Sequence, residues 1–530
     1  MKTQLLILFL TFCLGIKAQS LTDTLFWSGT IDIYENLYID GQTTLVIDPG
    51  TIITVHNNSK IETNGNVFAH GQFDNKIIFT AADTVGLNDT AAPYGGWNGF
   101  HLLNNPNGKA VFSNCVFEYG KSNIPGSWYG YGVNYDTLSA NQGGVIRASN
   151  FGNISFTNCM FYDNMARTSG GAIFTENVKK IELNNSLFNN NRTHFKGGAL
   201  YCNNHDTLRI DDVVFKNNSS WYQQSGSLTA HGGAIYLRND YPETSFNQVS
   251  NSLFFNNISL TTVYSNAQQV VFYNNLMTNN YNGATLYFSR LPSTNRVFNN
   301  TIAHNYFFAS IPGIYTASND MKIYNNILWD NLSDTIRTQD LVIQWHYNLP
   351  TVFNNVIWEA RSPGGPMIDE DPLFTNPSPC YGLDDNGWEY DWSLQDDSPA
   401  VNTGTPDTTG LQIPLYDLLG NPRIFGGRID MGAYENQNVW VSLPNNPLVN
   451  AKLIAAPNPF RDMFVVELFG PEKVKRISVY NQTGSIVRQM ETLWHEGLVS
   501  IDLSGFASGL YVLVVEYENG EVKTEKMVKL

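Results

Sequence analysis

Apolar and polar residues alternate in short stretches through the middle of the chain, and one short motif returns there many times. It consists of an aromatic or aliphatic residue, any residue, an Asn, and an apolar residue two positions later. The Asn position, once taken by Asp, falls at Asn114, Asn158, Asn185, Asp212, Asn251, Asn275, Asn300, Asn326 and Asn355. Subtracting neighbouring positions gives 44, 27, 27, 39, 24, 25, 26 and 29. The base period is therefore in the mid-twenties, and two of the intervals contain insertions.

A second motif, Gly-Gly followed by two apolar residues, runs in phase with the first. It begins at Gly143, Gly170, Gly197 and Gly232, and its first three copies are again 27 residues apart. No stretch between the motifs has the length and period of an amphipathic helix. A leucine-rich repeat needs a leucine framework, which is absent, and a propeller blade needs a longer period. The pattern predicts an all-β, right-handed parallel β-helix, in which each coil adds one strand to each of two or three parallel sheets.

Equivalent residues on neighbouring coils of such a β-helix stack about 4.8 Å apart, and two inward-facing stacks are predicted. The first contains Phe112, Phe156, Leu183, Ile210 and Val249, and the second contains Val116, Met160, Leu187, Val214 and Leu253. The recurring Asn is expected in the tight turn between two sheets, because its amide reaches the next coil and Asn tolerates a left-handed backbone. The Gly-Gly pair is expected to let the chain turn sharply into the next strand.

The N-terminus has the features of a secretory signal peptide over residues 1–18. Lys2 precedes an apolar stretch from Leu5 to Ile16, and Ala18 provides a small residue before the cleavage point. About a dozen apolar residues are too few for a stable membrane span. No later stretch is long enough either, so the mature chain is expected to have no transmembrane segment.

The C-terminal part is predicted to be a separate domain. Pro444 and Pro447 mark a linker over residues 441–453, which follows a β-helix over residues 19–440. Short alternating stretches at 464–468, 476–480 and 510–516 then predict a small antiparallel β-sandwich over residues 454–530.

The charge of the chain bears on its partners, and its cysteine content bears on how the fold is held together. The formal net charge is -16 and no Lys/Arg cluster occurs, so nucleic acid is not an expected partner. Four cysteines remain after signal-peptide removal, which are too few to staple a chain of this size. Cys115 and Cys159 occupy the same repeat position. A disulfide between neighbouring coils and two buried free thiols remain equal alternatives.

Two segments of the body resemble known families. Gly-Gly-Ala-Ile at 170–173 and Phe-Asn-Asn-Asn at 188–191 resemble right-handed β-helix proteins, among them polymorphic outer-membrane proteins. Residues 371–435 resemble the end of the choice-of-anchor Q group, a β-helix family named for its variable anchors. Four segments carry this second resemblance: Asp371-Pro372-Leu373-Phe374, Ser398-Pro399-Ala400-Val401-Asn402-Thr403-Gly404, Gly420-Asn421-Pro422-Arg423 and Asp430-Met431-Gly432-Ala433-Tyr434-Glu435.

The tail resembles the type A C-terminal sorting domain of the Bacteroidetes type IX secretion system. The sorting-signal residues implied by this resemblance are Pro457, Asn458, Pro459, Gly484, Gly509, Leu510, Tyr511, Lys526 and Lys529. The resemblance implies that the secretion machinery is a partner and that the protein crosses the outer membrane. Cleavage of the tail is then expected, with attachment to the cell surface or release. None of these resemblances names a ligand.

Two insertions, at residues 121–142 and 219–231, interrupt the repeat at the same phase. They are therefore expected to emerge from the same side, three coils apart. Their aromatic residues are the candidate ligand-binding residues: Trp128, Tyr129, Tyr131, Tyr135, Trp221 and Tyr222. Aromatic rings on polar, Gly-rich loops suit the apolar faces of sugar rings. The alternative is that these rings fold back and cover the sheet.

No catalytic set and no metal cluster are evident. The pair Asp211-Asp212 replaces the Asn of the repeat and is expected to form a turn. The run Asp384-Asp385-Asn386-Gly387 is a candidate Ca²⁺ site, although it lacks a full ligand loop. The leading hypothesis is an exported, non-catalytic surface or secreted protein that binds carbohydrate or a matrix partner. The alternatives are a polysaccharide lyase or glycoside hydrolase on the same scaffold, and a structural stalk.

Overall fold

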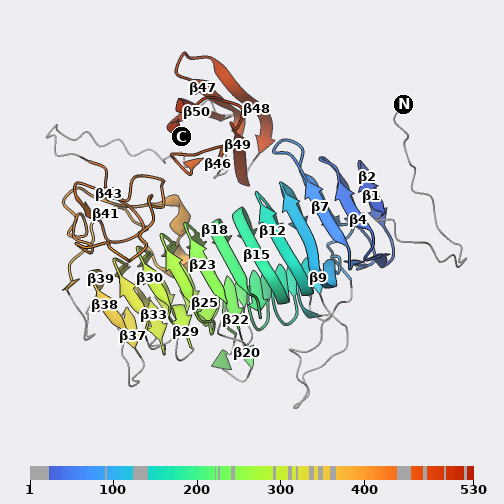
Figure 1. Ribbon diagram of the computed structural model, residues 1–530, viewed down its shortest axis with the longest axis horizontal. Coiled ribbons are helices and arrows are strands. Elements are labelled where there is room, and N and C mark those ends of the chain that lie inside the picture. Colours follow the sequence, from blue (N-terminus) through green and yellow to red (C-terminus); the bar gives the residue numbers. More distant parts are fainter. Residues whose placement is uncertain are drawn as a thin grey trace, which may run out of the picture.

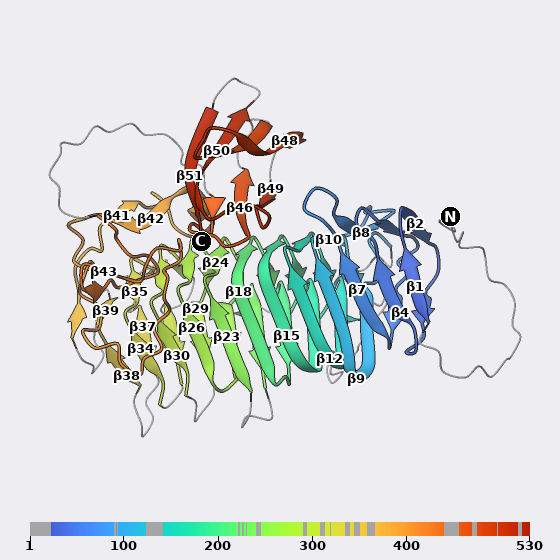
Figure 2. The same cartoon turned by 45° about the horizontal axis from the view of Figure 1, so that its top comes forward.

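The chain winds into a long solenoid of parallel strands that carries a small antiparallel domain on one side (Figures 1 and 2). A continuous sheet of 31 strands makes up the solenoid. The predicted fold, a parallel β-helix followed by a small antiparallel β-domain, is confirmed. The computed structural model describes residues 23–89, 92, 94–122, 141–220, 223–224, 227–228, 230–239, 245–289, 294–307, 313–317, 320–333, 340–343, 350–357, 366–438, 455–468, 474–494, 497–517 and 522–530.

The continuous sheet bends into three faces, and each coil contributes to every face. Face I contains β1 (Thr24–Trp27), β4 (Thr44–Ile47), β7 (Asn66–His70), β9 (Phe100–Ser113), β12 (Ile146–Thr157), β15 (Ile173–Asn189), β18 (Thr207–Lys216), β23 (Phe246–Ser250), β26 (Val270–Tyr273), β30 (Arg296–Phe298), β34 (Lys322–Tyr324) and β38 (Thr351–Phe353). Face II contains β2 (Thr30–Ile33), β5 (Ile52–Val55), β8 (Ile77–Ala81), β10 (Cys115–Glu118), β13 (Met160–Tyr162), the ends of β15 and β18, β24 (Leu253–Phe255), β27 (Leu276–Thr278), β31 (Thr301–Ala303), β35 (Ile327–Trp329), β39 (Asn355–Ile357) and β40 (Met367–Ile368). Face III contains β3 (Leu37–Ile39), β6 (Ile61–Thr63), the starts of β9, β12 and β15, β17 (Leu200–Asn203), β22 (Ile235–Arg238), β25 (Thr261–Ser265), β29 (Ala284–Phe288), β33 (Ile314–Thr316) and β37 (Leu341–Ile343).

Short strands form two further ladders between faces II and III. They are β11 (Lys121–Ser122), β14 (Met165–Ala166), β16 (Arg192–Thr193) and β19 (Ser219–Ser220), and then β28 (Tyr281–Asn282), β32 (Tyr306–Phe307) and β36 (Leu332–Ser333).

The repeated Asn and Gly-Gly motifs form bends of the coils, as the sequence predicts. In the later coils the left-handed residue is the one before the predicted Asn: Asn274, Asn299, Asn325 and Asn354. Asn158, Asn185 and Asp212 have φ values of 55°, 44° and 56°, and they stand at equivalent positions between faces I and II. Asn adopts this left-handed backbone more readily than most residues. A Cβ added to Gly171 would lie 1.9 Å from the carbonyl oxygen of Gly198 on the next coil, so only glycine fits there.

The first predicted inward stack is confirmed, and the second is wrong. Phe112, Phe156, Leu183, Ile210 and Val249 are fully buried in the solenoid core. The second set, Val116, Met160, Leu187, Val214 and Leu253, faces outward instead.

The left-handed corner explains this error. Phe156 points inward, and simple alternation would then point Met160 inward as well. The bend at Asn158 resets the alternation, so Cys159 and Phe161 point inward and Met160 points outward. The inward positions of face II are therefore taken by a column of rings at Phe117, Phe161, Phe188, Phe215 and Phe254.

A ladder of buried asparagines lines the second bend of each coil, between face II and the short ladders. Its members are Asn164, Asn191, Asn218, Asn257, Asn280, Asn305 and Asn331. Asn218 is typical: its Nδ2 donates to Asn257 Oδ1 at 3.1 Å and to the carbonyl oxygen of Phe188 at 2.8 Å. The amides thus satisfy backbone groups that the bend leaves without a sheet partner.

The structure has free thiols at Cys115 and Cys159, which are buried on adjacent coils. Burial and the neighbouring Cys159 raise the pKa of the Cys115 thiol well above its ordinary value. Cys202 is also buried and Cys380 is exposed. Within the described part of the chain, no helix has the length and apolar character needed to cross a membrane.

After β40 the chain leaves the coils and runs back over the outside of the solenoid. We call residues 369–438 the strap. Its elements are β41 (Phe374–Asn376), η3 (Gly382–Asp384), η4 (Gly387–Glu389), β42 (Asp391–Leu394), β43 (Ile424–Phe425) and β44 (Arg428–Ile429). Trp392 and Met431 of the strap pack on Ile327 and Val356, which face outward from face II. The strap therefore covers the C-terminal half of the outward apolar column.

The tail domain packs on the part of that column that contains Leu187 and Val214. Its strands are β45 (Ala455–Ala456), β46 (Met463–Leu468), β47 (Val474–Asn481), β48 (Ile486–Trp494), β49 (Gly497–Asp502), β50 (Gly509–Tyr517) and β51 (Val522–Lys529). They form two antiparallel sheets around a separate core. Val465 packs against the cluster of Leu187 and Val214, and Asn185 Nδ2 lies 3.6 Å from Met463 Sδ. The tail is thus seated on the solenoid.

Candidate functional site

Both sequence insertions leave and rejoin the solenoid at equivalent positions. Each departs after a strand of one parallel ladder, at Ser122 in β11 and Ser220 in β19. Each returns in one column of parallel bridges, at Gln142 and His231. The ends of the insertions are three coils apart, about 14 Å along the axis. The candidate binding residues Trp128, Tyr129, Tyr131, Tyr135, Trp221 and Tyr222 lie outside the described residues.

A column of stacked aromatic rings runs along the outward side of face III, beside the points where the insertions return. We call it the tyrosine ladder; it consists of Phe174, Tyr201, Tyr236, Tyr264, Tyr287 and Tyr315. Neighbouring ring centroids are 4.5–5.4 Å apart and nearly parallel. Tyr201 and Tyr236 are buried, whereas Tyr264, Tyr287 and Tyr315 are half-buried. Because the ring faces contact each other, the ladder presents ring edges and phenol groups to its surroundings.

The groups beside the ladder include Lys196, whose Nζ lies 5.8 Å from the centroid of the Tyr236 ring. The ring of His231 lies 4.9 Å from that of Tyr264. The pKa of His231 is lowered to about 4, mainly by burial and to a smaller extent by the nearby Lys196. The pKa of Tyr287 is raised to about 12, mainly by burial and to a smaller extent by the neighbouring Tyr315. This surface therefore offers neutral imidazole and phenol groups together with the Lys196 side chain.

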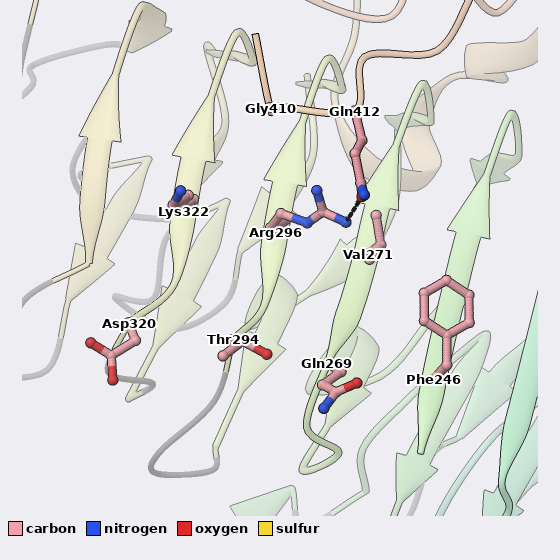
Figure 3. A pocket seen from close by; sticks show the side chains of 9 residues that line it. All are labelled: Phe246, Gln269, Val271, Thr294, Arg296, Asp320, Lys322, Gly410 and Gln412. Carbon is pink, nitrogen blue, oxygen red and sulfur yellow. Dashed lines mark hydrogen bonds between the residues drawn. The ribbon is translucent and has the colours of Figure 1, made fainter. Parts of the chain in front are cut away.

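A cleft with a volume of about 450 Å³ opens on the outward side of face I (Figure 3). Its floor consists of Val271, Arg296 and Lys322, from the successive strands β26, β30 and β34. Phe246 of β23 bounds one end. Strap residues Gly410 and Gln412 form one side, and the strand-start residues Gln269, Thr294 and Asp320 form the other. The strap is fixed there because Arg296 Nη2 donates to Gln412 Oε1 at 2.7 Å.

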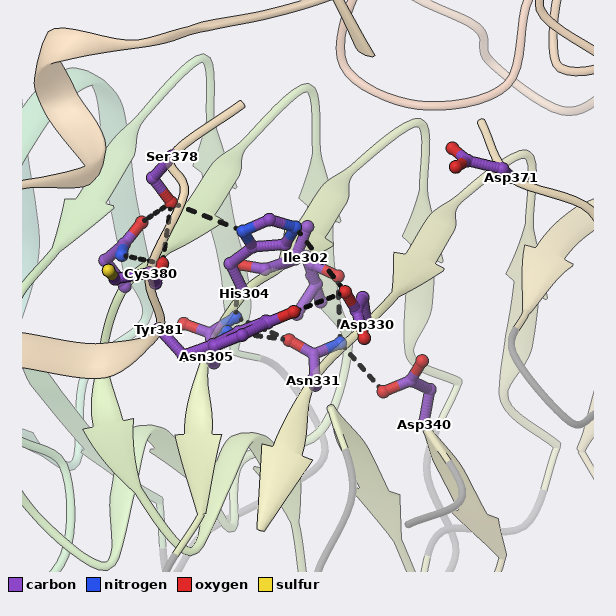
Figure 4. A network of polar contacts seen from close by, with 12 residues as sticks. Ile302, His304, Asn305, Asp330, Asn331, Asp340, Asp371, Ser378, Cys380 and Tyr381 are labelled. Atoms are coloured by element: carbon purple, nitrogen blue, oxygen red, sulfur yellow. Dashed lines mark hydrogen bonds and ion pairs between the residues drawn. The ribbon is translucent and has the colours of Figure 1, made fainter. Parts of the chain in front are cut away.

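A serine, a histidine and an aspartate meet where the strap crosses the corners of face II (Figure 4). Ser378 Oγ lies 3.3 Å from His304 Nδ1, and His304 Nε2 lies 3.9 Å from Asp330 Oδ2. Ser378 is only 1% exposed, and its hydroxyl is also within bonding distance of Asn279 Oδ1 and the carbonyl oxygen of Cys380. A buried hydroxyl with these partners is bonded within the protein, and the group fastens the strap to the corners of face II.

Corner residues hold the strap along its whole course. Asn256 donates to the carbonyl of Asp385 at 2.7 Å, and Asn279 donates to the carbonyl of Cys380 at 3.0 Å. On the other corner, Asn274 donates to the carbonyl of Tyr416 at 2.8 Å. Asparagines that turn the coil therefore also bind the segment that covers it.

Three of the four segments that resemble the choice-of-anchor Q group meet around a buried charged cluster. Arg423 is surrounded by Asp417, Asp430 and Glu435. Each carboxylate also accepts backbone N–H groups; Glu435, for example, accepts from Phe425 and Asp430, both at 3.0 Å. Burial, and then Asp430, raise the pKa of Glu435 to about 8, and burial raises that of Asp430 to about 6. The remaining segment, residues 371–374, contacts the segment at 398–404: the Ser398 hydroxyl donates to the carbonyl oxygen of Pro372 at 2.5 Å.

The candidate Ca²⁺ residues contact other parts of the strap. Asp385 Oδ1 accepts from the backbone of Asn386 at 2.8 Å and from the Tyr390 hydroxyl at 2.9 Å. No group of three or more His, Cys, Asp or Glu side chains in the described residues has a spacing suited to a metal ion. Calcium binding remains untested.

Several predicted sorting-signal residues meet at one edge of the tail domain. Asn458, between Pro457 and Pro459, donates to the carbonyl of Lys526 at 2.7 Å and accepts from the backbone of Val528 at 2.8 Å. Along β50 and β51, Gly509 pairs with Lys529, Leu510 with Val528 and Tyr511 with Met527. Gly484 turns the chain between β47 and β48. Their role in sorting remains a prediction.

Comparison with known proteins identifies two parts of the chain. Residues 455–530 match the secretion system C-terminal sorting domain. Residues 185–203 and 212–238 match the repeat of Chlamydia polymorphic membrane proteins. No curated protein matches the chain. The predicted type IX sorting domain is therefore confirmed at the C-terminus, and together the two matches support an exported protein that is secreted or displayed at the cell surface.

Proposed function

We propose that this protein is a non-catalytic, carbohydrate-binding β-helix of the bacterial cell surface or secretome, and that glycan lies along the insertion side of the solenoid. The observation that carries the proposal is the shared origin of the two insertions beside the tyrosine ladder. Both rejoin the coil next to face III, and both carry aromatic residues in their sequence. A site built from two aromatic loops and a row of phenol groups suits a polymer that runs parallel to the solenoid axis.

The chemistry of the ladder supports a polyhydroxylated ligand. Phenol groups recur at each coil, about 4.8 Å apart, and Ser289 Oγ donates to the Tyr264 hydroxyl at 2.9 Å. His231 and Tyr287 are neutral at neutral pH. Neutral donors and acceptors next to apolar ring edges are the combination that sugar hydroxyls and C–H groups need.

Four described acidic groups occupy structural positions, which favours binding over catalysis. Asp212 turns the coil, and Asp417, Asp430 and Glu435 are buried within the strap. The enzyme alternative, a polysaccharide lyase or hydrolase, requires carboxylates that reach a bound sugar. The choice-of-anchor Q assignment of residues 371–435 belongs to this proposal too. Its support is that three of the four segments meet around Arg423 and that the first segment is bonded to one of them through Ser398.

A glycan array tests the proposal directly. The mature chain is expected to retain a defined set of glycans, and Trp128→Ala and Trp221→Ala are expected to weaken that binding. Tyr287→Phe removes one phenol group from the ladder and is expected to weaken it less. Tyr416→Phe is the matched control, because Tyr416 is 40% exposed in the strap, at the corner between faces I and II. Absence of any bound glycan, or unchanged binding in both tryptophan variants, would contradict the proposal. New reducing ends or unsaturated products would favour the enzyme.

A further inference from the structure

We propose that the cleft on face I binds the carboxylate groups of an acidic glycan. This site is separate from the insertion side and does not depend on the function proposed for it. Arg296 and Lys322 stand at register positions on adjacent strands and both rise from the cleft floor (Figure 3). Adjacent strands are about 4.8 Å apart, so one carboxylate can contact both cations, or two successive carboxylates can each take one.

Arg296 and Lys322 differ in how firmly their side chains are held, and this difference suits recognition of a carboxylate. Arg296 is held in place by Gln412 Oε1 at 2.7 Å and by the carbonyl of Leu411 at 3.4 Å. A guanidinium fixed in this way loses little conformational freedom when it binds a carboxylate. Lys322 is exposed, and its flexible ammonium group can follow the ligand.

The shape of the cleft favours a strand rather than a compact anion. Phe246, Val271, Arg296 and Lys322 lie on four successive strands, which span about 14 Å along the solenoid axis. Gln269, Thr294 and Gln412 offer neutral polar groups along the sides. At the end wall, the Arg209 guanidinium lies 5.8 Å from the centre of the Phe246 ring and adds a third positive charge. Amide and hydroxyl groups between cations match the alternation of hydroxyls and carboxylates in a uronate polymer.

The charges close to the cleft decide whether it attracts an anion or a cation, although the whole chain has a net charge of -16. Charges farther away than about 8 Å are screened at physiological ionic strength. Among the described residues that line the cleft, Asp320 is the one acidic side chain, against Arg296 and Lys322. Nucleic acid fits less well, because single strands need several aromatic stacking platforms, and Phe246 is the one aromatic residue among the described residues of this lining.

Calorimetry with oligogalacturonate tests this inference on the mature chain. The expected result is binding that weakens as NaCl is raised and that is lost when the carboxylates are methyl-esterified. Lys322→Gln is expected to reduce the affinity about tenfold, the typical effect of losing one charge-assisted hydrogen bond. Lys109→Gln is the matched control, because Lys109 is exposed on β9 of the same face, outside the cleft lining.

Two results would overturn the inference. One is failure of the wild-type chain to bind oligogalacturonate at low salt. The other is equal affinity for the acid and its methyl ester, or for wild type and Lys322→Gln. Trp128→Ala separates this site from the insertion side: it is expected to leave oligogalacturonate binding unchanged. Loss of that binding in Trp128→Ala would place the anion on the insertion side and refute the cleft.

Discussion

The side-chain amide of Asn331 donates to Oδ1 of Asp340 at 2.8 Å, and this bond ends the ladder of buried asparagines. Asp340 is 1% exposed, and its second carboxyl oxygen has no hydrogen-bond partner. The ladder is therefore capped by an acid where the preceding coils have an amide. Burial raises the pKa of Asp340 well above its ordinary value.

Asp340→Asn is therefore expected to stabilise the protein. A folded-state pKa above the unfolded one means that ionisation opposes folding, so the penalty appears as pH rises above the unfolded pKa. Replacing the acid by an amide is expected to raise the free energy of unfolding by about 1–4 kcal/mol at pH 8, and by less at pH 4. Urea unfolding at both pH values measures this. Asp320→Asn, at an exposed position, is the control. Destabilisation at pH 8 would contradict the prediction.

The Arg423 cluster predicts a pH dependence of the strap. The pKa values of about 8 for Glu435 and about 6 for Asp430 lie above the ordinary values. Between about pH 4 and pH 8 the folded strap therefore binds more protons than the unfolded chain. Its stability should fall with rising pH, by at most about 1.4 kcal/mol per pH unit for each extra proton.

Thermal unfolding followed from pH 5 to pH 8.5 checks this dependence. Glu435→Gln is expected to flatten the profile, because it removes the group with the highest pKa in the cluster. A stability that rises over this range, or a profile unaffected by Glu435→Gln, would show that the carboxylates are ionised throughout.

The asparagine ladder itself is expected to be a major source of stability. Asn218→Ala removes two donated bonds and leaves the carbonyl of Phe188 and the amides of Asn191 without their partner. The expected cost is about 2–4 kcal/mol. Asn184→Ala, on the outward side of face I, is the control and should change stability by about 0.5 kcal/mol or less. Equal effects of the two substitutions in urea unfolding would refute the role of the ladder.

The seat of the tail domain depends on Gly420. The backbone N–H of Asn458 donates to the carbonyl of Leu419 at 3.2 Å, and a Cβ on Gly420 would lie 2.9 Å from the carbonyl group of Asn458. Gly420→Ala is therefore expected to push the tail away from the solenoid while both parts remain folded.

Hydroxyl-radical footprinting reads out this displacement at Met463 of the tail strand β46, which contacts Asn185 of the solenoid. Its oxidation should increase several-fold in Gly420→Ala, whereas Met431, at 1% exposure, should not change. Gly484→Ala is the matched control. Gly420 and Gly484 both have φ of 79°, but no atom lies within 4 Å of a Cβ added to Gly484. The same oxidation in both variants would show that backbone strain alone causes the change.

The coil architecture could be predicted from the sequence because one period governs both motifs. The Asn and Gly-Gly positions follow directly from backbone geometry at the bends. The side chains of face II that point inward were mispredicted, because the bend at Asn158 interrupts the alternation of inward and outward residues along a strand. The inner ladder was missed, although consecutive Asn pairs such as Asn190-Asn191 and Asn217-Asn218 recur in the sequence and signal it.

The cleft could not be predicted in the same way. Arg296 and Lys322 are one coil apart, and the period alone brings them together. Gln412 reaches them only because the strap reverses over the solenoid, and no repeat in the sequence encodes that reversal. The insertion ends, by contrast, follow from the period and were predicted correctly, whereas the aromatic residues within the insertions remain predictions.

The most direct test of the central claim is a pair of distances between nitroxide labels along the outward side of face I. Ser155 and Gln248 stand three coils apart, and Ser155 and Lys322 stand six coils apart. Cysteines introduced at these positions, with the exposed Cys380 replaced by Ser, allow pulsed electron paramagnetic resonance. Stacked coils predict that the second mean distance exceeds the first by about 14 Å. A difference far from this value, or distances without a defined maximum, would contradict a continuous parallel β-helix.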